Sequence, residues 1–202
     1  MESPPLEPGD EALARRAADG DESAFEALVA RFQGRVYRLA CRLTGSEGEA
    51  EDVLQETFLQ AYRGLPTFRS EARFATWLYR IATNAALMQN RRRDRRPTEP
   101  LEEYAPRFDA DGRHALQEAE LALAARADEI IDRQRLAEQA RAGIERLPEI
   151  YRTAFVLRDL EEMPTAEVAA VLGIDAAAVR QRVHRARMML RGFLSHLVGV
   201  EP

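Results

Sequence analysis

Apolar residues recur along this chain with a period close to 3.6, and this spacing is the strongest constraint on its fold. In the first third of the chain the large apolar side chains fall three or four positions apart, at Phe25, Leu28, Val29, Phe32, Val36, Leu39 and Leu43. Similar spacing returns between residues 133 and 197. No segment shows the period-two alternation of a half-buried strand. The sequence therefore predicts an all-α fold.

Glycine and proline divide the periodic segments into separate helices. After an N-terminus that we expect to be disordered over residues 1–10, the predicted helices span 11–44, 49–64, 73–93, 113–131, 133–147, 151–160, 165–172 and 176–197. Two small domains are expected. The predicted boundaries are an acidic N-terminal extension at 1–23, a first domain at 24–97, a partly helical linker at 98–132 and a second domain at 133–199.

The net charge of -5 conceals two basic blocks. Residues 69–96 contain eight Arg and two acidic residues, and residues 178–202 contain five Arg and one acidic residue. The stretch between the blocks, 97–131, is acidic. Two such blocks are expected of a protein that contacts a polyanion at two places, although each block alone could be a solvated helix face.

The composition argues against several classes of protein. The single cysteine, Cys41, cannot form an internal disulfide and is expected in the helical core. We find no metal-ligand spacing, no Gly-rich phosphate loop and no nucleophile–base pair. No apolar run is long enough to span a membrane, and the acidic, Pro-rich N-terminus is not a secretory signal. We therefore expect a soluble cytoplasmic protein without enzymatic activity, metal or cofactor.

Residues 164–191 follow the pattern of a helix-turn-helix. Gly173 can end the short first helix, and Asp175 can cap the second. Arg and Gln on the polar face of the second helix can bond to guanine and adenine edges in the major groove. The candidate DNA-contacting residues are Arg180, Gln181, Arg182, His184, Arg185 and Arg187. The alternative interpretation is an ordinary helical hairpin.

The segment at residues 68–96, called here the middle basic segment, contains several aromatic residues as well as Arg. On the helix from Arg73, the side chains of Trp77, Arg80 and Asn84 lie at one edge of the apolar side. An aromatic plane beside an amide can hold an unstacked base, while Arg side chains contact the backbone. The candidates are Phe68, Phe74, Trp77, Arg80, Asn84, Arg91 and Arg92. Alternatively, Trp77 is a core residue and the Arg run is a solubilising helix end.

Two long segments resemble one known family. DVLQETFLQAYRGLPTF at 52–68, followed by FATWLYRIATN at 74–84, resembles domain two of the extracytoplasmic-function (ECF) sigma factors, a branch of the sigma-70 family. Residues 147–191 resemble domain four of the same proteins. The order and spacing of the segments also match, so the resemblance covers about 150 of 202 residues.

The resemblance implies a protein that binds core RNA polymerase and directs it to promoters. On the helix at 52–63 it implies contacts with the clamp coiled coil of the largest catalytic subunits, through Asp52, Gln55, Glu56, Leu59 and Arg63. It places Asn84 and a base pocket at 68–74 on the -10 element, and the helix at 176–191 in the major groove of the -35 element. It also implies contact with the polymerase flap and, as a further partner, an anti-sigma factor.

The sequence departs from the family pattern at several points. Ala177 and Ala178 stand where the family often has Gly-Thr, and Gln181 stands where Ser is common, so the -35 preference is expected to shift. Two other classes stay open. A stand-alone helix-turn-helix regulator would bind duplex DNA without polymerase, and a helical adaptor would have no affinity for nucleic acid.

Overall fold

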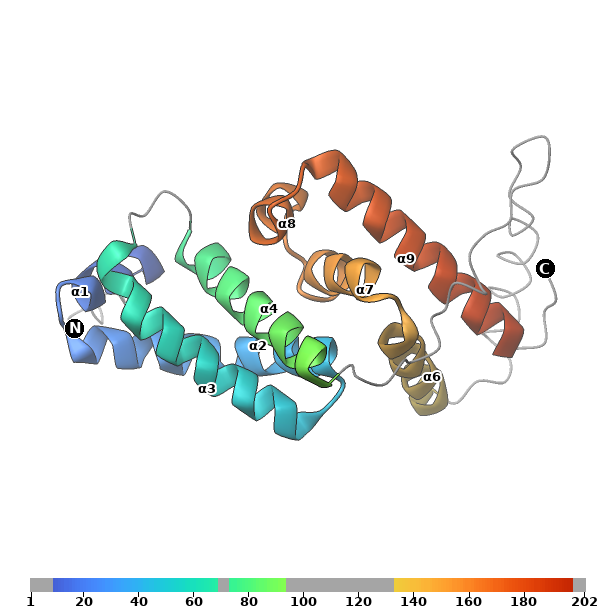
Figure 1. The fold of residues 1–202 in the computed structure, drawn as a ribbon, viewed down its shortest axis with the longest axis horizontal. Coiled ribbons are helices and arrows are strands. Elements are labelled where there is room, and N and C mark those ends of the chain that lie inside the picture. Colours follow the sequence, from blue (N-terminus) through green and yellow to red (C-terminus); the bar gives the residue numbers. More distant parts are fainter. Residues whose placement is uncertain (1–8, 69–72, 94–132, 198–202) are drawn as a thin grey trace, which may run out of the picture. The chain divides into compact units, whose positions relative to one another are not determined.

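The structure is a computed structural model, and it describes residues 9–68, 73–93 and 133–197. Every regular element in these ranges is a helix, so the all-α prediction is confirmed (Figure 1). The α-helices are α1 (Asp10–Ala18), α2 (Glu22–Thr44), α3 (Glu47–Gly64), α4 (Phe74–Arg93), α6 (Arg133–Arg146), α7 (Glu149–Phe155), α8 (Thr165–Leu172) and α9 (Ala176–Leu197). A 3-10 turn, η1 (Leu65–Thr67), follows α3, and a π-helical turn, η3 (Val156–Leu160), follows α7. The predictions for residues 1–8 and for the linker within 94–132 lie outside the described residues.

The described residues form two compact units. The first contains α1 to α4 together with residues 166–173, and the second contains α6, α7, η3 and α9. We describe each unit by itself.

The single helix predicted over 11–44 is wrong, because the chain turns between α1 and α2. Gly20 has a φ of 94°, a left-handed conformation that glycine adopts without steric cost. Asp21 then caps α2 by accepting a hydrogen bond from the backbone N–H of Ala24 at 3.1 Å. Hydrogen bonds from Ser23, Arg16 and Ala24 lower the pKa of Asp21 to about 2. The Asp-Gly-Asp sequence at 19–21 was the signal for this turn.

Helices α2, α3 and α4 pack pairwise around one core, and α1 packs against α2, α4 and η1. The spacing of apolar residues along 49–65 predicts a buried stripe of Leu54, Phe58, Ala61 and Leu65. Ala61 and Leu65 are buried, but Leu54 and Phe58 are only partly buried, and Thr57 is fully buried instead. The Thr57 hydroxyl donates to the carbonyl of Val53 at 2.6 Å, which satisfies its polar group inside the core.

Hydrogen bonds from α4 fix the ends of α2 and α3. The buried Asn90 side chain donates to the carbonyl of Leu43 at 3.0 Å. Arg93 donates to the carbonyl of Thr44 and to the carboxylate of Glu49, both at 2.6 Å. These bonds satisfy carbonyls that the last turn of a helix leaves without partners. They also hold α3 and α4 in one arrangement, which sets the surface between them.

The core of the second unit joins α6 and α7 to the C-terminal half of α9. Its buried members are Leu147, Ala186, Met189, Leu190 and Phe193. A Cβ atom on residue 143 would lie 2.8 Å from the Phe193 ring, so the glycine at this position allows α6 and α9 to approach closely.

The turn before α9 contains the helix-ending glycine and the capping aspartate that the sequence predicts there. Gly173 follows α8 with a φ of 65°, and Asp175 accepts a hydrogen bond from the backbone N–H of Ala178 at 2.7 Å. Val179 and Val183 are buried and form the apolar stripe at the start of α9. The turn and stripe together fix where α9 begins and which of its faces is exposed.

Candidate functional site

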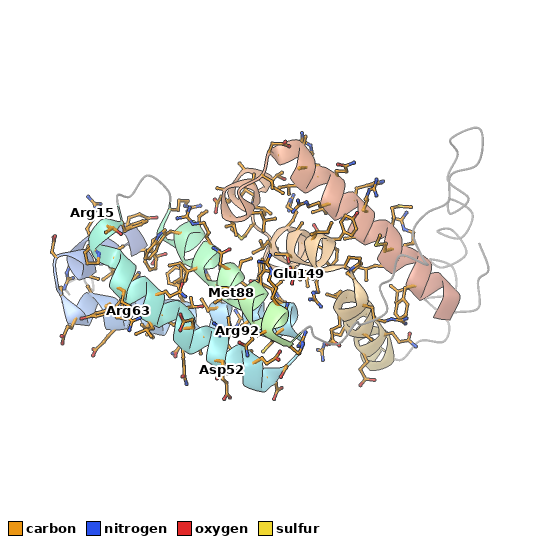
Figure 2. The ribbon with its side chains drawn as sticks, viewed as in Figure 1. Arg15, Asp52, Arg63, Met88, Arg92 and Glu149 are labelled. Carbon is orange, nitrogen blue, oxygen red and sulfur yellow. The ribbon has the colours of Figure 1, made fainter. Side chains whose placement is uncertain are left out.

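A groove of about 610 Å³ lies between α3 and α4. It is lined by Asp52, Val53, Gln55, Glu56, Leu59, Gln60, Ala85, Met88, Gln89 and Arg92. The structure thus brings together four of the five α3 residues predicted to bind polymerase. The fifth, Arg63, is exposed one helical turn beyond Leu59. Figure 2 labels Asp52 and Arg63 on α3, and Met88 and Arg92 on α4.

Large apolar side chains stand exposed in and beside this groove. Leu59 is 44% exposed and Met88 is 51% exposed. Tyr62, also 51% exposed, stacks edge-on against Phe25 with ring centroids 5.0 Å apart. Acidic and basic side chains, including Asp52 and Arg92, line the same groove as Leu59 and Met88. Exposed apolar side chains next to charged ones are typical of a protein–protein interface.

The aromatic residues of the middle basic segment divide into buried and accessible rings. Phe74 is 1% exposed and packs against Phe32 in the core, with ring centroids 5.5 Å apart. Trp77 is half-buried, and its ring centroid lies 5.0 Å from that of Phe68 and 5.7 Å from that of Phe74. Gly64 makes room for the indole, since a Cβ there would lie 3.1 Å from it. The core therefore holds Trp77 in one orientation.

Asn84 and Arg80 are exposed on α4, as predicted. At about 100° per residue, Arg91 lies on the same side of the helix as Asn84. Arg92 instead lines the groove with α3, so the structure separates two Arg that the sequence grouped together. Residues 69–72 of the predicted base pocket lie outside the described residues.

The polar residues of α9 span a wide arc around the helix axis. Arg180, Gln181, His184, Arg185 and Arg187 are exposed, and Arg182 is partly buried. At about 100° per residue, Arg180 and Arg187 lie on one flank of the exposed face and Arg185 on the other, with Gln181 and His184 between them. Side chains on opposite flanks point in different directions, so the six candidates cannot all have the same role.

Arg187 is held in an ion pair that the sequence did not predict. Its Nε and Nη2 atoms donate to the two carboxylate oxygens of Asp159, both at 2.8 Å. The hydrogen bond to Asp159 raises the pKa of Arg187 above its usual value. A paired, planar contact of this kind fixes the guanidinium in place. The partners are 28 residues apart, so helical periodicity gave no signal for the pair.

Two family models match the chain. Residues 28–96 match the model described as Sigma-70 region 2, and residues 137–190 match the model described as Sigma-70, region 4. The two matches cover more than half of the chain and contain α3, α4 and most of α9. The chain belongs to the sigma-70 family.

Individual relatives place this sigma factor in the ECF branch. The ECF RNA polymerase sigma factor SigE of Mycolicibacterium smegmatis is 35% identical over 195 residues, covering 94% of this chain and 71% of the relative. The RNA polymerase sigma-H factor of Pseudomonas aeruginosa is 37% identical over 180 residues, covering 88% of this chain and 90% of the relative. CnrH, solved in complex with the cytosolic domain of CnrY, matches with a TM-score of 0.64 and 28% identity, covering 96% of this chain and 99% of CnrH.

These findings confirm the resemblance seen in the sequence. The protein is an alternative sigma factor, which directs promoter-specific transcription initiation by RNA polymerase. The alternative interpretation, a stand-alone regulator, is not favoured.

Other features of this sigma factor were not visible in its sequence. Met88 and Arg92 of α4 line the same groove as the α3 candidates. The helical pattern of the sequence does not show which helix packs beside α4, so this could not be predicted. Cys41, expected in the core, is only partly buried, and its hydrogen bond with Tyr37 raises the pKa of the tyrosine.

Within the described ranges, no cluster of His, Cys, Asp and Glu could hold a metal ion, and no helix is long and apolar enough to cross a membrane.

Proposed function

We propose that this sigma factor binds the clamp of core RNA polymerase through the surface around the α3–α4 groove. The observation that supports this assignment is the pair of exposed apolar side chains, Leu59 and Met88, surrounded by charged residues. Burial of such a centre drives association, and the charged rim sets orientation. Asp52, Gln55, Glu56 and Arg63 complete the proposed contact surface, and Arg92 joins it from α4.

The exposed side of α4 is proposed to contact the melted -10 element. Asn84 presents an amide that can bond to the edge of an unpaired base, and Trp77 presents part of an indole on which a base can stack. Arg80 and Arg91, on the same side, are suited to backbone phosphates. Phe74 is buried, so we assign it and the neighbouring Phe68 a supporting role under Trp77.

Helix α9 is proposed to contact the major groove of the -35 element. Gln181, His184 and Arg185 are the proposed base contacts, since they occupy the exposed face opposite the buried valines. Arg180 and Arg182, at the edges of this face, are suited to phosphates. Arg187 is tied to Asp159, which favours a positioning role over base recognition.

The domain boundaries follow from the same assignments. We propose a polymerase-binding and -10-binding domain ending at residue 97, a linker at 98–132 and a -35-binding domain at 133–199. Helix α1 buries Leu13 and Ala14 against the first bundle, which supports including it in that domain rather than in an extension ending at residue 23. The second domain is also proposed to contact the polymerase flap.

We further propose that the protein has no enzymatic activity or cofactor of its own and acts in the cytoplasm, where promoter DNA and polymerase meet. CnrH, a relative in structure, was solved with a second polypeptide, the cytosolic domain of CnrY. By analogy, a protein regulator such as an anti-sigma factor is proposed for this chain.

Binding to promoter DNA with and without purified core polymerase tests the proposed function. A sigma factor should bind its promoter specifically only when core polymerase is present. Tight, sequence-specific binding by the free chain, unchanged by polymerase, would favour a stand-alone regulator. A lack of nucleic-acid binding in both states would favour an adaptor.

A further inference from the structure

Four arginines form a stripe along α2, called here the α2 arginine stripe. They are Arg31, Arg35, Arg38 and Arg42. Because they are three or four positions apart, at about 100° per residue they lie within an arc of about 60°. The stripe is about 16 Å long, since its ends are separated by a rise of about 1.5 Å per residue. Residues 27–46 contain no Asp or Glu, so α2 itself places no carboxylate one helical turn from any of these arginines.

One end of the α2 arginine stripe already binds a carboxylate. Arg31 donates from Nη1 to Asp10, the first residue of α1, at 3.0 Å. Arg35 and Arg38 are exposed, and among the residues that the structure describes they make no ion pair. The guanidinium of Arg35 lies 6.0 Å from the centroid of the Phe32 ring. The middle of the stripe therefore presents positive charge that no described carboxylate balances.

The direction of α1 determines which part of the chain lies next to this positive charge. Only residues 19–21 join α1 to α2, and the two helices pack together, so they run in opposite directions. The bond between Asp10 and Arg31 places the start of α1 part-way along α2. The exposed arginines of the stripe lie beyond that point. The residues that precede α1 in the sequence therefore start beside them.

The segment that precedes α1, residues 1–9, has the charge that the stripe lacks. It contains two glutamates, Glu2 and Glu7, and no basic side chain. Glu7 is three residues before Asp10, and three residues of extended chain span about 10 Å. Arg38 is seven residues after Arg31, which corresponds to about 10 Å along the helix. From the position where Asp10 is held, Glu7 can therefore reach the middle of the stripe.

We propose that the middle of the α2 arginine stripe is a docking site for residues 1–9 of this chain, with Arg35 and Arg38 as the cationic contacts and Glu7 as the main anion. The short connection to Asp10 gives the segment an effective concentration in the millimolar range at the site. Exposed ion pairs are individually weak, so the occupancy of the site falls as salt rises. The docked segment shields a basic face of the first bundle from other polyanions. The proposal does not depend on the roles assigned to α3, α4 and α9.

Paramagnetic relaxation enhancement in the full chain tests the location. A nitroxide on Ser3→Cys, in a Cys41→Ser background, should broaden the amide signals of residues 35–38 at low salt, and the signals should recover at about 0.5 M salt. Glu7→Arg should remove the broadening. The charge reversals Arg35→Glu and Arg38→Glu, made together, should also remove it, and adding Glu7→Arg to them should restore it.

Arg141→Glu, at an exposed position of α6, is the matched control and should leave the broadening as in the parent chain. Broadening that is insensitive to salt and to all of these charge reversals would overturn the proposal, as would broadening confined to other helices. Because Arg35 and Arg38 are exposed, their variants should keep the parent Tm, which thermal unfolding checks.

Binding of the free chain to heparin, a polyanion without base sequence, tests the shielding. Glu7→Gln should raise the affinity about two- to fivefold at low salt, because the stripe is no longer covered. The rise should vanish when Arg35→Ala and Arg38→Ala are also present. Glu26→Gln, which removes an exposed carboxylate from the opposite side of α2, is the matched control. An equal rise for both glutamine variants, or a rise that persists without the two arginines, would show an effect of net charge alone and contradict docking.

Discussion

The α3–α4 groove and the α9 cavity differ in the chemistry of their linings. The groove exposes Leu59 and Met88 and is also lined by side chains of both charge signs. The cavity beside α9, of about 270 Å³, is smaller, and the charged side chains in its lining are Arg158, Arg180 and Arg187. The first lining suits another protein and the second suits a polyanion. The net charge of the whole chain, -5, predicts the composition of neither surface. The kind of partner that each surface binds is therefore inferred from the side chains that line it.

The largest effect is expected at the centre of the groove. Leu59→Asp should weaken binding to core polymerase at least about 30-fold, because a charge would be desolvated in the middle of an apolar contact. The Tm should change little, since Leu59 is 44% exposed and is not part of the buried core. Binding measured by fluorescence titration checks this, with Gln33→Asp on the exposed side of α2 as control. Equal affinity of both variants for core polymerase would place the interface elsewhere.

Substitutions of base-contacting residues on α9 should have the opposite effect: polymerase binding should stay normal and promoter preference should change. Arg185→Ala should cost about 1–3 kcal/mol at the preferred -35 sequence and relax preference at one base position. Arg191→Ala, on the other flank, should lower affinity without changing preference. Transcription from a library of -35 variants measures both effects. A uniform loss across all sequences in both variants would show that Arg185 does not contact a base.

On α4, Asn84→Ala should separate base recognition from folding. A surface amide contributes within about 0.5 kcal/mol to stability, so the Tm and polymerase binding should be nearly unchanged. Open-complex formation should fall about tenfold, with altered preference at one -10 position. The defect should persist on templates that are already melted. A large fall in Tm with intact promoter preference would instead make Asn84 structural.

The smallest effect is expected at the corner between α1 and α2, whose residues line neither the α3–α4 groove nor the α9 cavity. Asp21→Asn keeps an acceptor that can cap α2 but removes the charge that pairs with Arg16. Because the folded-state pKa of Asp21 is about 2, against an ordinary value of 3.8, its ionic contribution to stability is present above about pH 4 and is lost as pH falls towards 2.

The Tm of Asp21→Asn should accordingly be lower than that of the wild type by a few degrees at pH 7, and the two should converge near pH 2. Thermal unfolding between pH 2 and 7 measures this, with Asp19→Asn in the same turn as control. A difference in Tm that does not depend on pH would show that the ion pair contributes nothing. Promoter preference should not change in either variant.

The sequence was sufficient to predict most of the described helices and several of their exposed positions. The predicted ranges 49–64, 73–93 and 176–197 agree with α3, α4 and α9 to within two residues, because capping residues and prolines are local signals. The exposed positions of Asp52, Glu56 and Asn84 were likewise confirmed, since helical periodicity determines which residues face away from a core.

Features that depend on contacts between distant residues could not be predicted in this way. The pairing of Asp159 with Arg187, and the presence of Met88 and Leu59 in one groove, can be known only once it is known which helices pack together. The burial of Phe74, predicted as a base contact, depends on its position against Phe32 of α2. The period of a single helix contains no information about these tertiary neighbours.

In vitro transcription with purified core polymerase is the most direct test of this division of roles. On a promoter library the wild-type chain should direct initiation at promoters that share a -10 and a -35 element. Leu59→Asp should abolish transcription from all of them, whereas Arg185→Ala should shift the set of promoters used. Transcription that is unaffected by Leu59→Asp, or an identical promoter set with Arg185→Ala, would contradict the assignment of the α3–α4 groove to polymerase and of α9 to DNA.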